Sequence, residues 1–240
     1  SGKLARQSAY GLRRCDEVRA LEREREAAAR DLGRPPPPRI GLYPETKHPS
    51  YFAAAGLALE PALLRALTRA GYAGREAPVR IQSFEVGNLQ ALRRLTDLPL
   101  VQLIEKRGAP YDCTARADAC TYASMIRPEG LAAIARYADA IGVEKSLVLP
   151  VTPRGTLGEA TPLVADAHAA GLEVHAWTFR AENEFLPLAL RSGGDPAALG
   201  DALAEIGAFL QAGIDGLFID QPALGVRARN AFSVGSRGAA

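Results

Sequence analysis

Residues 39–52 read RIGLYPETKHPSYF, and they place a carboxylate and an ammonium two positions apart just after an apolar segment. The segment 40–43 is typical of a buried β-strand that ends at Pro44. In an extended chain, residues two apart project to the same side, so Glu45 and Lys47 are expected to face one space. A carboxylate suits a hard cation such as calcium or magnesium, and an ammonium suits a phosphate oxygen. The pair therefore predicts a clamp in which a cation and a lysine hold one phosphate.

Two simpler arrangements of the same residues remain open. Glu45 and Lys47 can form an internal ion pair, or both can point outward on a loop. His48 follows directly and is expected at the rim of any such site, with a donor close to the phosphate as the alternative.

Polar and aromatic residues recur at the ends of the other apolar segments. They are Ser83, Phe84 and Glu85 after VRIQ; Glu105 and Lys106 after LVQLI; Trp177, Thr178 and Arg180 in VHAWTFR; and Asp220 after GLFI. Parallel strands that deliver such residues to one edge build a site in the way that (β/α) barrels do. Trp177 is expected either to wall an apolar part of a ligand or to pack in the core. Asp220 can bind a polar ligand, orient Lys47 or cap a helix.

Strand-like and helix-like segments alternate through the chain. We expect helices at 16–31, 60–71, 87–96, 128–142, 161–171 and 195–213, and strands at 39–44, 79–84, 98–104, 146–150, 172–179 and 214–220. Apolar strands between helices predict an α/β protein with a parallel sheet covered on both faces. No GxGxxG or GxxxxGK[ST] motif opens a helix, which favours a TIM-type (β/α) barrel over a nucleotide-binding open sheet. With about six of the eight strands of a closed barrel, it is expected to be incomplete.

Composition limits the partners. The net charge is +2, from 29 basic and 27 acidic residues, and gives no electrostatic indication of a nucleic-acid partner or a membrane surface. No apolar run approaches the roughly 20 residues of a membrane span. Cys113 and Cys120 can form a small disulfide loop or remain separate thiols, and the dispersed histidines and cysteines make a zinc site unlikely.

Five segments together resemble the glycerophosphodiester phosphodiesterase family, of the bacterial periplasmic or secreted type. They are YPETKHPSYF, VRIQSFEVGNLQALRRL, LPLVQLIEKRGAPYD, VHAWTFRAENEFLP and GIDGLFIDQP, and they follow the family's order across roughly residues 12 to 230. The resemblance implies a TIM-type barrel, here a single domain over 1–240, that hydrolyses glycerophosphodiesters to glycerol 3-phosphate and an alcohol. It also implies periplasmic or secreted localisation, although no signal peptide is visible in this sequence.

The resemblance assigns roles residue by residue. The Glu of the family's E-x-K motif, a metal ligand, falls on Glu45, and its phosphate-proximal Lys falls on Lys47. The aromatic residues that border the family's substrate pocket fall on Phe84 and Trp177. The cofactor implied is a divalent cation, usually calcium, with magnesium as an alternative.

The sequence also departs from the family pattern. The family opens with an H-R-G strand, an E-x-D strand and an H-D pair, which supply two catalytic histidines and two further metal carboxylates, and none of these occurs here. We therefore expect no catalytic residue in this chain and little activity of the chain alone. A barrel that lacks two strands leaves unpaired edges, so we expect self-association or marginal stability. The alternative is a non-catalytic remnant that binds a phosphodiester or a protein partner.

Overall fold

The computed structural model describes residues 2–115 and 119–237, with side chains from residue 16 to residue 232. The chain divides into two compact units, Ser1–Val101 and Gln102–Ala240, which are described one at a time. None of the helices in the described residues is long and apolar enough to cross a membrane.

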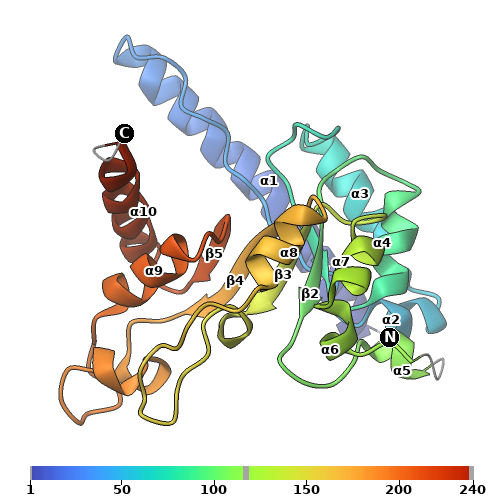
Figure 1. Cartoon of the computed structure of the whole chain (residues 1–240). Helices are drawn as coiled ribbons and strands as arrows, with labels where there is room; N and C mark the ends of the chain where they lie inside the picture. Colours follow the sequence, from blue (N-terminus) through green and yellow to red (C-terminus); the bar gives the residue numbers. More distant parts are fainter. Residues whose placement is uncertain (1, 116–118, 238–240) are drawn as a thin grey trace. The chain divides into compact units, whose positions relative to one another are not determined.

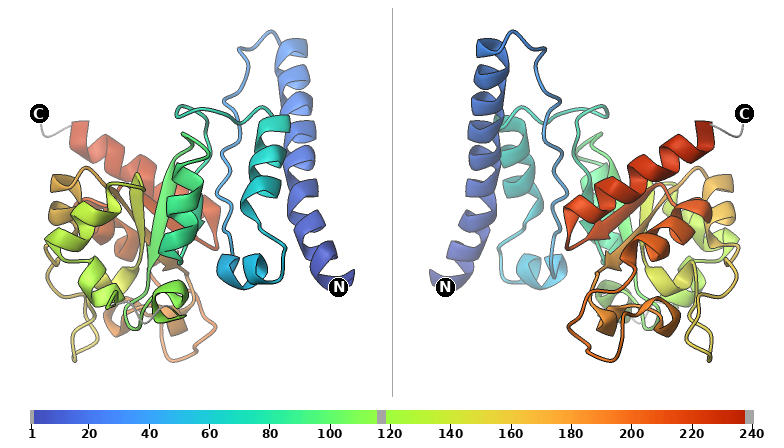
Figure 2. Two further views of the ribbon diagram at one scale, coloured as in Figure 1. Left: turned by 90° about the vertical axis from the view of Figure 1, so that its right-hand side faces the viewer. Right: turned by 90° about the vertical axis from the view of Figure 1, so that its left-hand side faces the viewer.

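The first unit contains four helices and one short strand within its described residues. They are α1 (Gly2–Asp31), α2 (Pro49–Ala54), α3 (Glu60–Arg69), β1 (Ile81–Ser83) and α4 (Val86–Arg93). α1 and α3 pack side by side (Figure 2). α3 ends where Gly71 takes a φ of 75°, the left-handed conformation that glycine adopts at helix ends without steric cost.

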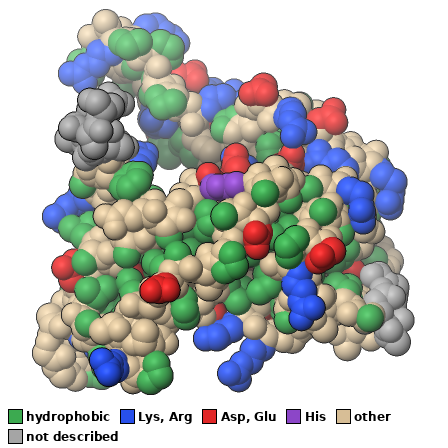
Figure 3. All heavy atoms as spheres, in the orientation of Figure 1, with side chains coloured by type: hydrophobic (Ala, Val, Ile, Leu, Met, Phe, Trp, Pro, Cys, Tyr) green, Lys and Arg blue, Asp and Glu red, His purple; other side chains and the backbone are tan. Residues whose placement is uncertain are grey.

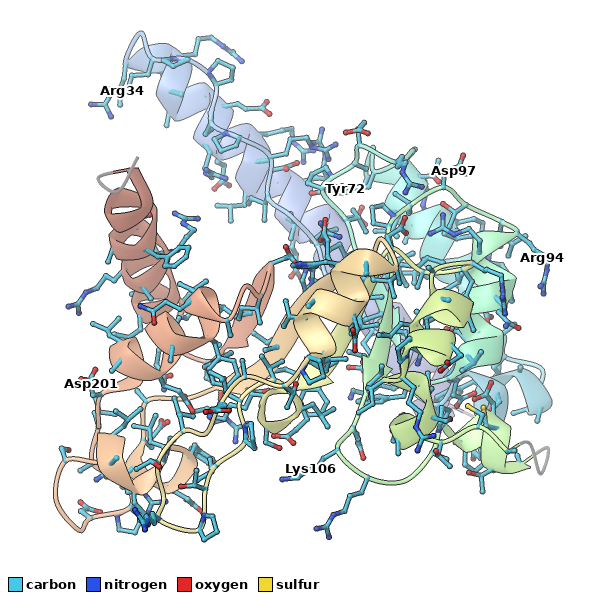
Figure 4. The ribbon with its side chains drawn as sticks, in the orientation of Figure 1. Arg34, Tyr72, Arg94, Asp97, Lys106 and Asp201 are labelled. Carbon is cyan, nitrogen blue, oxygen red and sulfur yellow. The ribbon has the colours of Figure 1, made fainter. Side chains whose placement is uncertain are left out.

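Glu22 ties α1 to the rest of this unit. The carboxylate is 3% exposed and accepts hydrogen bonds from the guanidinium groups of Arg19 and Arg39 and, at 2.8 Å, from the backbone N–H of Ile40. Tyr72, labelled beside α1 in Figure 4, donates to Glu22 at 3.3 Å and to the Ile40 carbonyl at 2.9 Å. Glu22 thus fixes the start of the segment that leads to Glu45.

That segment runs parallel to β1 and its approach. Leu42 forms a bridge with Val79, and Glu45 forms one with Gln82. The two bridges are in the same register, because the second lies three residues after the first in each segment. The expected strand at 39–44 is therefore present as two isolated bridges rather than as a continuous strand. β1 in turn lies beside the residues leading into the next strand, because the Ile81 N–H donates to the Pro99 carbonyl at 2.9 Å.

The second unit holds the remaining strands, with β2 (Leu100–Ile104) crossing the boundary between the units. Its other strands are β3 (Ala140–Glu144), β4 (Glu173–Phe179) and β5 (Gly216–Ile219). Its helices and 3-10 turns in the described residues are α5 (Tyr111–Ala115), α6 (Tyr122–Met125), α7 (Pro128–Ile134), η1 (Lys145–Leu147), α8 (Leu163–Ala169), η2 (Asn183–Phe185), η3 (Leu188–Leu190), α9 (Ala202–Gln211) and α10 (Pro222–Arg237).

Strands β2 to β5 lie side by side in chain order, and the pairs β3–β4 and β4–β5 are parallel (Figure 1). β2 is buried along its whole length and β3 up to its last residue, which explains their nearly continuous apolar sequences. Phe179 of β4 meets Phe209 of α9 edge to face at 4.9 Å between ring centroids. This contact packs the end of β4 against the covering helix.

The predicted fold class is confirmed. Parallel strands alternate with helices, and the described residues contain fewer than eight strands, as in an incomplete (β/α) barrel. The division into one domain over 1–240 stays a prediction.

Several element boundaries were wrong. The helix expected at 128–142 ends at Ile134, and the strand expected at 146–150 lies instead at Ala140–Glu144, followed by η1. The run ADAIGV satisfies either pattern locally, and β3 is selected because its residues pair with Glu173–Trp177 of β4. α9 starts at Ala202 rather than near Asp195, because Asp201 caps it by accepting the Ala204 N–H at 2.9 Å. α10 was not predicted.

Charge is distributed as the sequence suggested. On the face shown in Figure 3, basic and acidic side chains are interspersed rather than gathered by sign. Cys113 and Cys120 are both thiols, so the disulfide alternative is not what the structure shows.

Candidate active site

Glu45 and Lys47 form the ion pair that was one of the alternatives. Lys47 Nζ lies 3.0 Å from Glu45 Oε1. The Glu45 side chain is 20% exposed and the Lys47 side chain 71% exposed, so the ammonium remains open to solvent. The two residues therefore share one side of the segment, as their spacing predicted, and Lys47 can contact an anion without leaving Glu45.

The contacts of Thr46 show which side of the segment Glu45 and Lys47 share. Its N–H donates to the Gln82 carbonyl at 3.0 Å, and its hydroxyl donates to Asn88 Oδ1 of α4 at 2.6 Å. Since neighbouring residues of an extended chain point to opposite faces, Thr46 faces the helix and Glu45 faces away from it. Asn88 lies inside α4 and joins Thr46 to Glu60.

The turn after Lys47 is held by a second set of contacts. Glu85 is 2% exposed, and its Oε2 accepts the backbone N–H of Ser50 at 3.1 Å. Ser83 Oγ accepts the Glu85 N–H at 3.2 Å. His48, between the two anchors, has φ 50° and ψ 49° and is exposed, and its place at the rim of a site stays a prediction. The segment that carries Lys47 is thus bonded at both ends.

Gln82 is a residue that sequence reasoning missed. It bridges Glu45 and is 8% exposed, yet its Oε1 has no hydrogen-bond partner within the described part of the chain. The available signal was an amide directly before Ser83 at the end of the run VRIQ, which was interpreted simply as a strand.

The two aromatic candidates lie in different units. Phe84 follows β1 directly and is half-buried, one residue past Ser83. Trp177 lies in β4 opposite Glu144 and is also half-buried. His175, two residues earlier in β4, is a core histidine at 5% exposure whose Nε2 lies 3.1 Å from Glu173 Oε2.

Ion pairs occupy the carboxyl ends of the strands in the second unit. Arg180, after β4, donates to Asp220 Oδ2 at 2.7 Å and lies 4.5 Å over the Phe185 ring. Lys145, after β3, donates to Glu205 Oε1 at 2.7 Å and to the Phe185 carbonyl at 3.0 Å. This bond to Arg180 was not among the roles weighed for Asp220, which were a polar ligand, Lys47 and a helix cap.

The donor types at Glu45 fit a hard cation. The Glu45 carboxylate and the unpartnered Gln82 Oε1 are oxygen donors of the kind that calcium and magnesium bind. Calcium takes six to eight oxygens, and the described residues contain no group of three or more His, Cys, Asp or Glu side chains placed to hold a metal. These residues can therefore supply part of a coordination shell.

Comparisons with known proteins identify the family. Residues 15–224 match the model of the glycerophosphoryl diester phosphodiesterase family. A glycerophosphodiester phosphodiesterase of Arabidopsis thaliana is 32% identical over 194 residues, covering 75% of this chain and 49% of that protein. One from Haemophilus influenzae is 28% identical over 199 residues, covering 78% of this chain and 52% of that protein. One from Treponema pallidum is 25% identical over 200 residues, covering 79% and 53%.

The chain thus spans about half the length of the curated relatives it matches. The match still extends through the bridged segment at Glu45, the strands and the helices described above. The chain belongs to the glycerophosphoryl diester phosphodiesterase family.

Proposed function

We propose that this chain serves the hydrolysis of glycerophosphodiesters to glycerol 3-phosphate and an alcohol, with a divalent cation, calcium or magnesium, as cofactor. The observation that carries the proposal is the Glu45–Lys47 pair on the face turned away from α4, in a chain of this family. Glu45 is the proposed cation ligand and Lys47 the proposed phosphate contact.

Lys47 suits this task because its ammonium is neutralised on one side and open on the other. One N–H points to Glu45 at 3.0 Å, while the side chain remains 71% exposed. Its other N–H groups are available for charge-assisted hydrogen bonds to phosphoryl oxygens. The anchors at Thr46 and Ser50 hold the backbone on either side, so little ordering is needed on binding.

A bound divalent cation would neutralise charge that develops on the phosphoryl oxygens. Phe84 follows β1 in the unit that carries Glu45 and Lys47, and it is the proposed apolar border of the substrate pocket there. The role of Trp177 stays a prediction from the family resemblance. The family's pair of catalytic histidines has no counterpart in residues 1–240, so proton transfer to the leaving oxygen lacks its usual group. We infer that this polypeptide alone binds phosphate more readily than it turns over diester, and a binding role without catalysis is the second candidate function.

Turnover and binding separate these possibilities. The chain is incubated with glycerophosphocholine and calcium, and release of glycerol 3-phosphate is coupled to its oxidation. Titration of glycerol 3-phosphate in a calorimeter, with calcium present, measures binding. Binding with slow turnover supports the proposal for this polypeptide, and turnover at rates normal for phosphodiesterases contradicts its proposed inactivity alone. Absence of binding contradicts the assignment of the site.

A matched pair of lysine variants tests the phosphate contact. Lys47→Met is expected to weaken glycerol 3-phosphate binding at least tenfold, because charge-assisted bonds to phosphate are lost. Lys106→Met is the control, since Lys106 also follows a strand and is exposed, and Figure 4 labels it on the loop after β2. Equal effects of the two substitutions in calorimetry would show that Lys47 acts through net charge rather than at a site.

Localisation follows the family type named by the sequence resemblance. We propose a periplasmic or secreted protein that acts on a small-molecule glycerophosphodiester. Fractionation of cells expressing the native gene, with the chain detected by antibody, tests the location.

A further inference from the structure

Gln82 combines burial with an unpartnered oxygen beside the proposed cation ligand. It lies in β1 at 8% exposure, and its Oε1 has no hydrogen-bond partner among the described residues. Burying an amide oxygen without a partner costs desolvation free energy that an apolar side chain of similar size would not cost. A buried amide oxygen without a partner is available to accept a bond from a cation or a hydrogen-bond donor.

The bridge between the two segments sets where the side chain points. The Gln82 N–H donates to the Pro44 carbonyl at 2.9 Å, and the Thr46 N–H donates to the Gln82 carbonyl at 3.0 Å. This is the parallel bridge that pairs Glu45 with Gln82. Paired residues of adjacent strands project to the same face, so Gln82 and Glu45 are side-chain neighbours.

The opposite face is already occupied by the helix layer. Thr46 bonds Asn88 of α4, and Ser83, which is fully buried, donates to the Thr46 carbonyl at 3.4 Å. Glu45 and Gln82, one residue before each of these, therefore face away from α4 together.

We propose that Gln82 Oε1 is a second protein ligand of the divalent cation that Glu45 holds. The inference rests on the proposed function for the presence of the cation. The chemistry agrees, since calcium accepts neutral amide oxygens together with carboxylates. The buried, unpartnered oxygen is then the acceptor left open for the cation, and its desolvation is compensated when the ion binds.

The chain offers a matched control glutamine. Gln102, in β2, is buried as Gln82 is, but its amide is partnered: Oε1 accepts from the Tyr137 hydroxyl at 2.9 Å, and Nε2 donates to the Leu103 carbonyl at 3.0 Å. Replacing Gln102 by Leu removes these two hydrogen bonds. Replacing Gln82 by Leu removes an amide oxygen that has no partner among the described residues.

Calcium chloride is titrated into the chain in a calorimeter, and melting is followed without calcium. Gln82→Leu should weaken calcium affinity at least tenfold while the melting temperature without calcium stays equal or rises. Gln82→Glu should tighten calcium binding, because a charged oxygen replaces a neutral one. Gln102→Leu should lower the melting temperature and leave calcium affinity unchanged.

Three results would overturn the inference: no calcium binding by the unaltered chain, unchanged affinity in Gln82→Leu, or no tightening in Gln82→Glu. Glu45→Gln separates this from the proposed function. If Glu45→Gln loses calcium binding while Gln82→Leu keeps it, the result supports Glu45 as a cation ligand and excludes Gln82 as one. If neither variant changes the affinity, the cation site itself is misplaced.

Discussion

The buried carboxylate of Glu22 makes the stability of the first unit depend on pH. Burial opposes ionisation of Glu22, but hydrogen bonds from Arg19, the Ile40 N–H and Arg39 outweigh it and lower its pKa to about 2. A carboxyl whose pKa is lowered by folding stabilises the fold above its ordinary value near 4.5, and that stability is lost as pH falls toward 2. Acid therefore weakens the contact that fixes the start of the Glu45 segment.

Glu22→Gln is expected to lower the free energy of unfolding by roughly 1–3 kcal/mol at pH 7, because charge-assisted hydrogen bonds are lost. The difference from the unaltered chain should shrink as pH falls below about 4. Glu24→Gln, an exposed position on the same helix, is the control and should change little. Urea unfolding across this pH range measures both, and a difference independent of pH would exclude Glu22 as the titrating group.

At this scale the sequence predicted part of the site. The shared side of Glu45 and Lys47 follows from their spacing, because period-two alternation is local. The burial of Gln82 does not, since it depends on the pairing of 45 with 82 across a gap in the chain. For the same reason the bond between Asn88 and Thr46 could not be predicted, because the two residues are distant in sequence.

Elements were predicted well where one pattern dominates and poorly where two compete. α3, α8, β4 and β5 lie where expected, since each is bounded by glycine, proline or a charged turn. Residues 138–143 fit a helix or a strand locally, and pairing with β4 selects β3 and places Lys145 after its end. That placement decides which side chains reach the carboxyl edge of the sheet.

The Lys145–Glu205 pair ties the end of β3 to α9. Glu205 is 1% exposed and its Oε2 has no partner among the described residues. Burial raises the pKa of Glu205, and Lys145 lowers it in opposition, leaving the pKa above the ordinary value. The neutral carboxyl of Glu205 therefore stabilises the fold at pH values below its pKa in the unfolded chain. This contribution is lost as the pH rises through its pKa in the folded chain.

Lys145→Met should destabilise the chain by about 3–5 kcal/mol at pH 8, because a buried carboxylate is left without its cation. The loss should be smaller at pH 5, because burial raises the pKa of Glu205 and a lower pH favours its neutral form. Arg180→Met is the control: its partner Asp220 is 52% exposed in its side chain, so the cost should stay within about 1 kcal/mol. Chemical unfolding at the two pH values decides this, and equal losses at both would contradict the role given to Glu205.

For the whole molecule, the informative feature is the end of the sheet in the second unit. β5 has β4 as its strand neighbour, and no strand pairs with its other side among the described residues. All four of its residues are half-buried, whereas β2 is buried throughout. A strand edge with partly exposed apolar side chains is a template for pairing with another chain.

We therefore predict that the chain self-associates through β5. Leu217 and Ile219 approach Gly225 of α10, so Phe218, between them, faces the other way. Phe218→Lys places a charge on that face and should shift the chain toward monomer. Leu95→Lys, an exposed position in the first unit, is the control and should leave association unchanged. Sedimentation velocity over a hundredfold range of concentration measures this, and a single monomeric species at every concentration of the unaltered chain would show that the edge of β5 is not an interface.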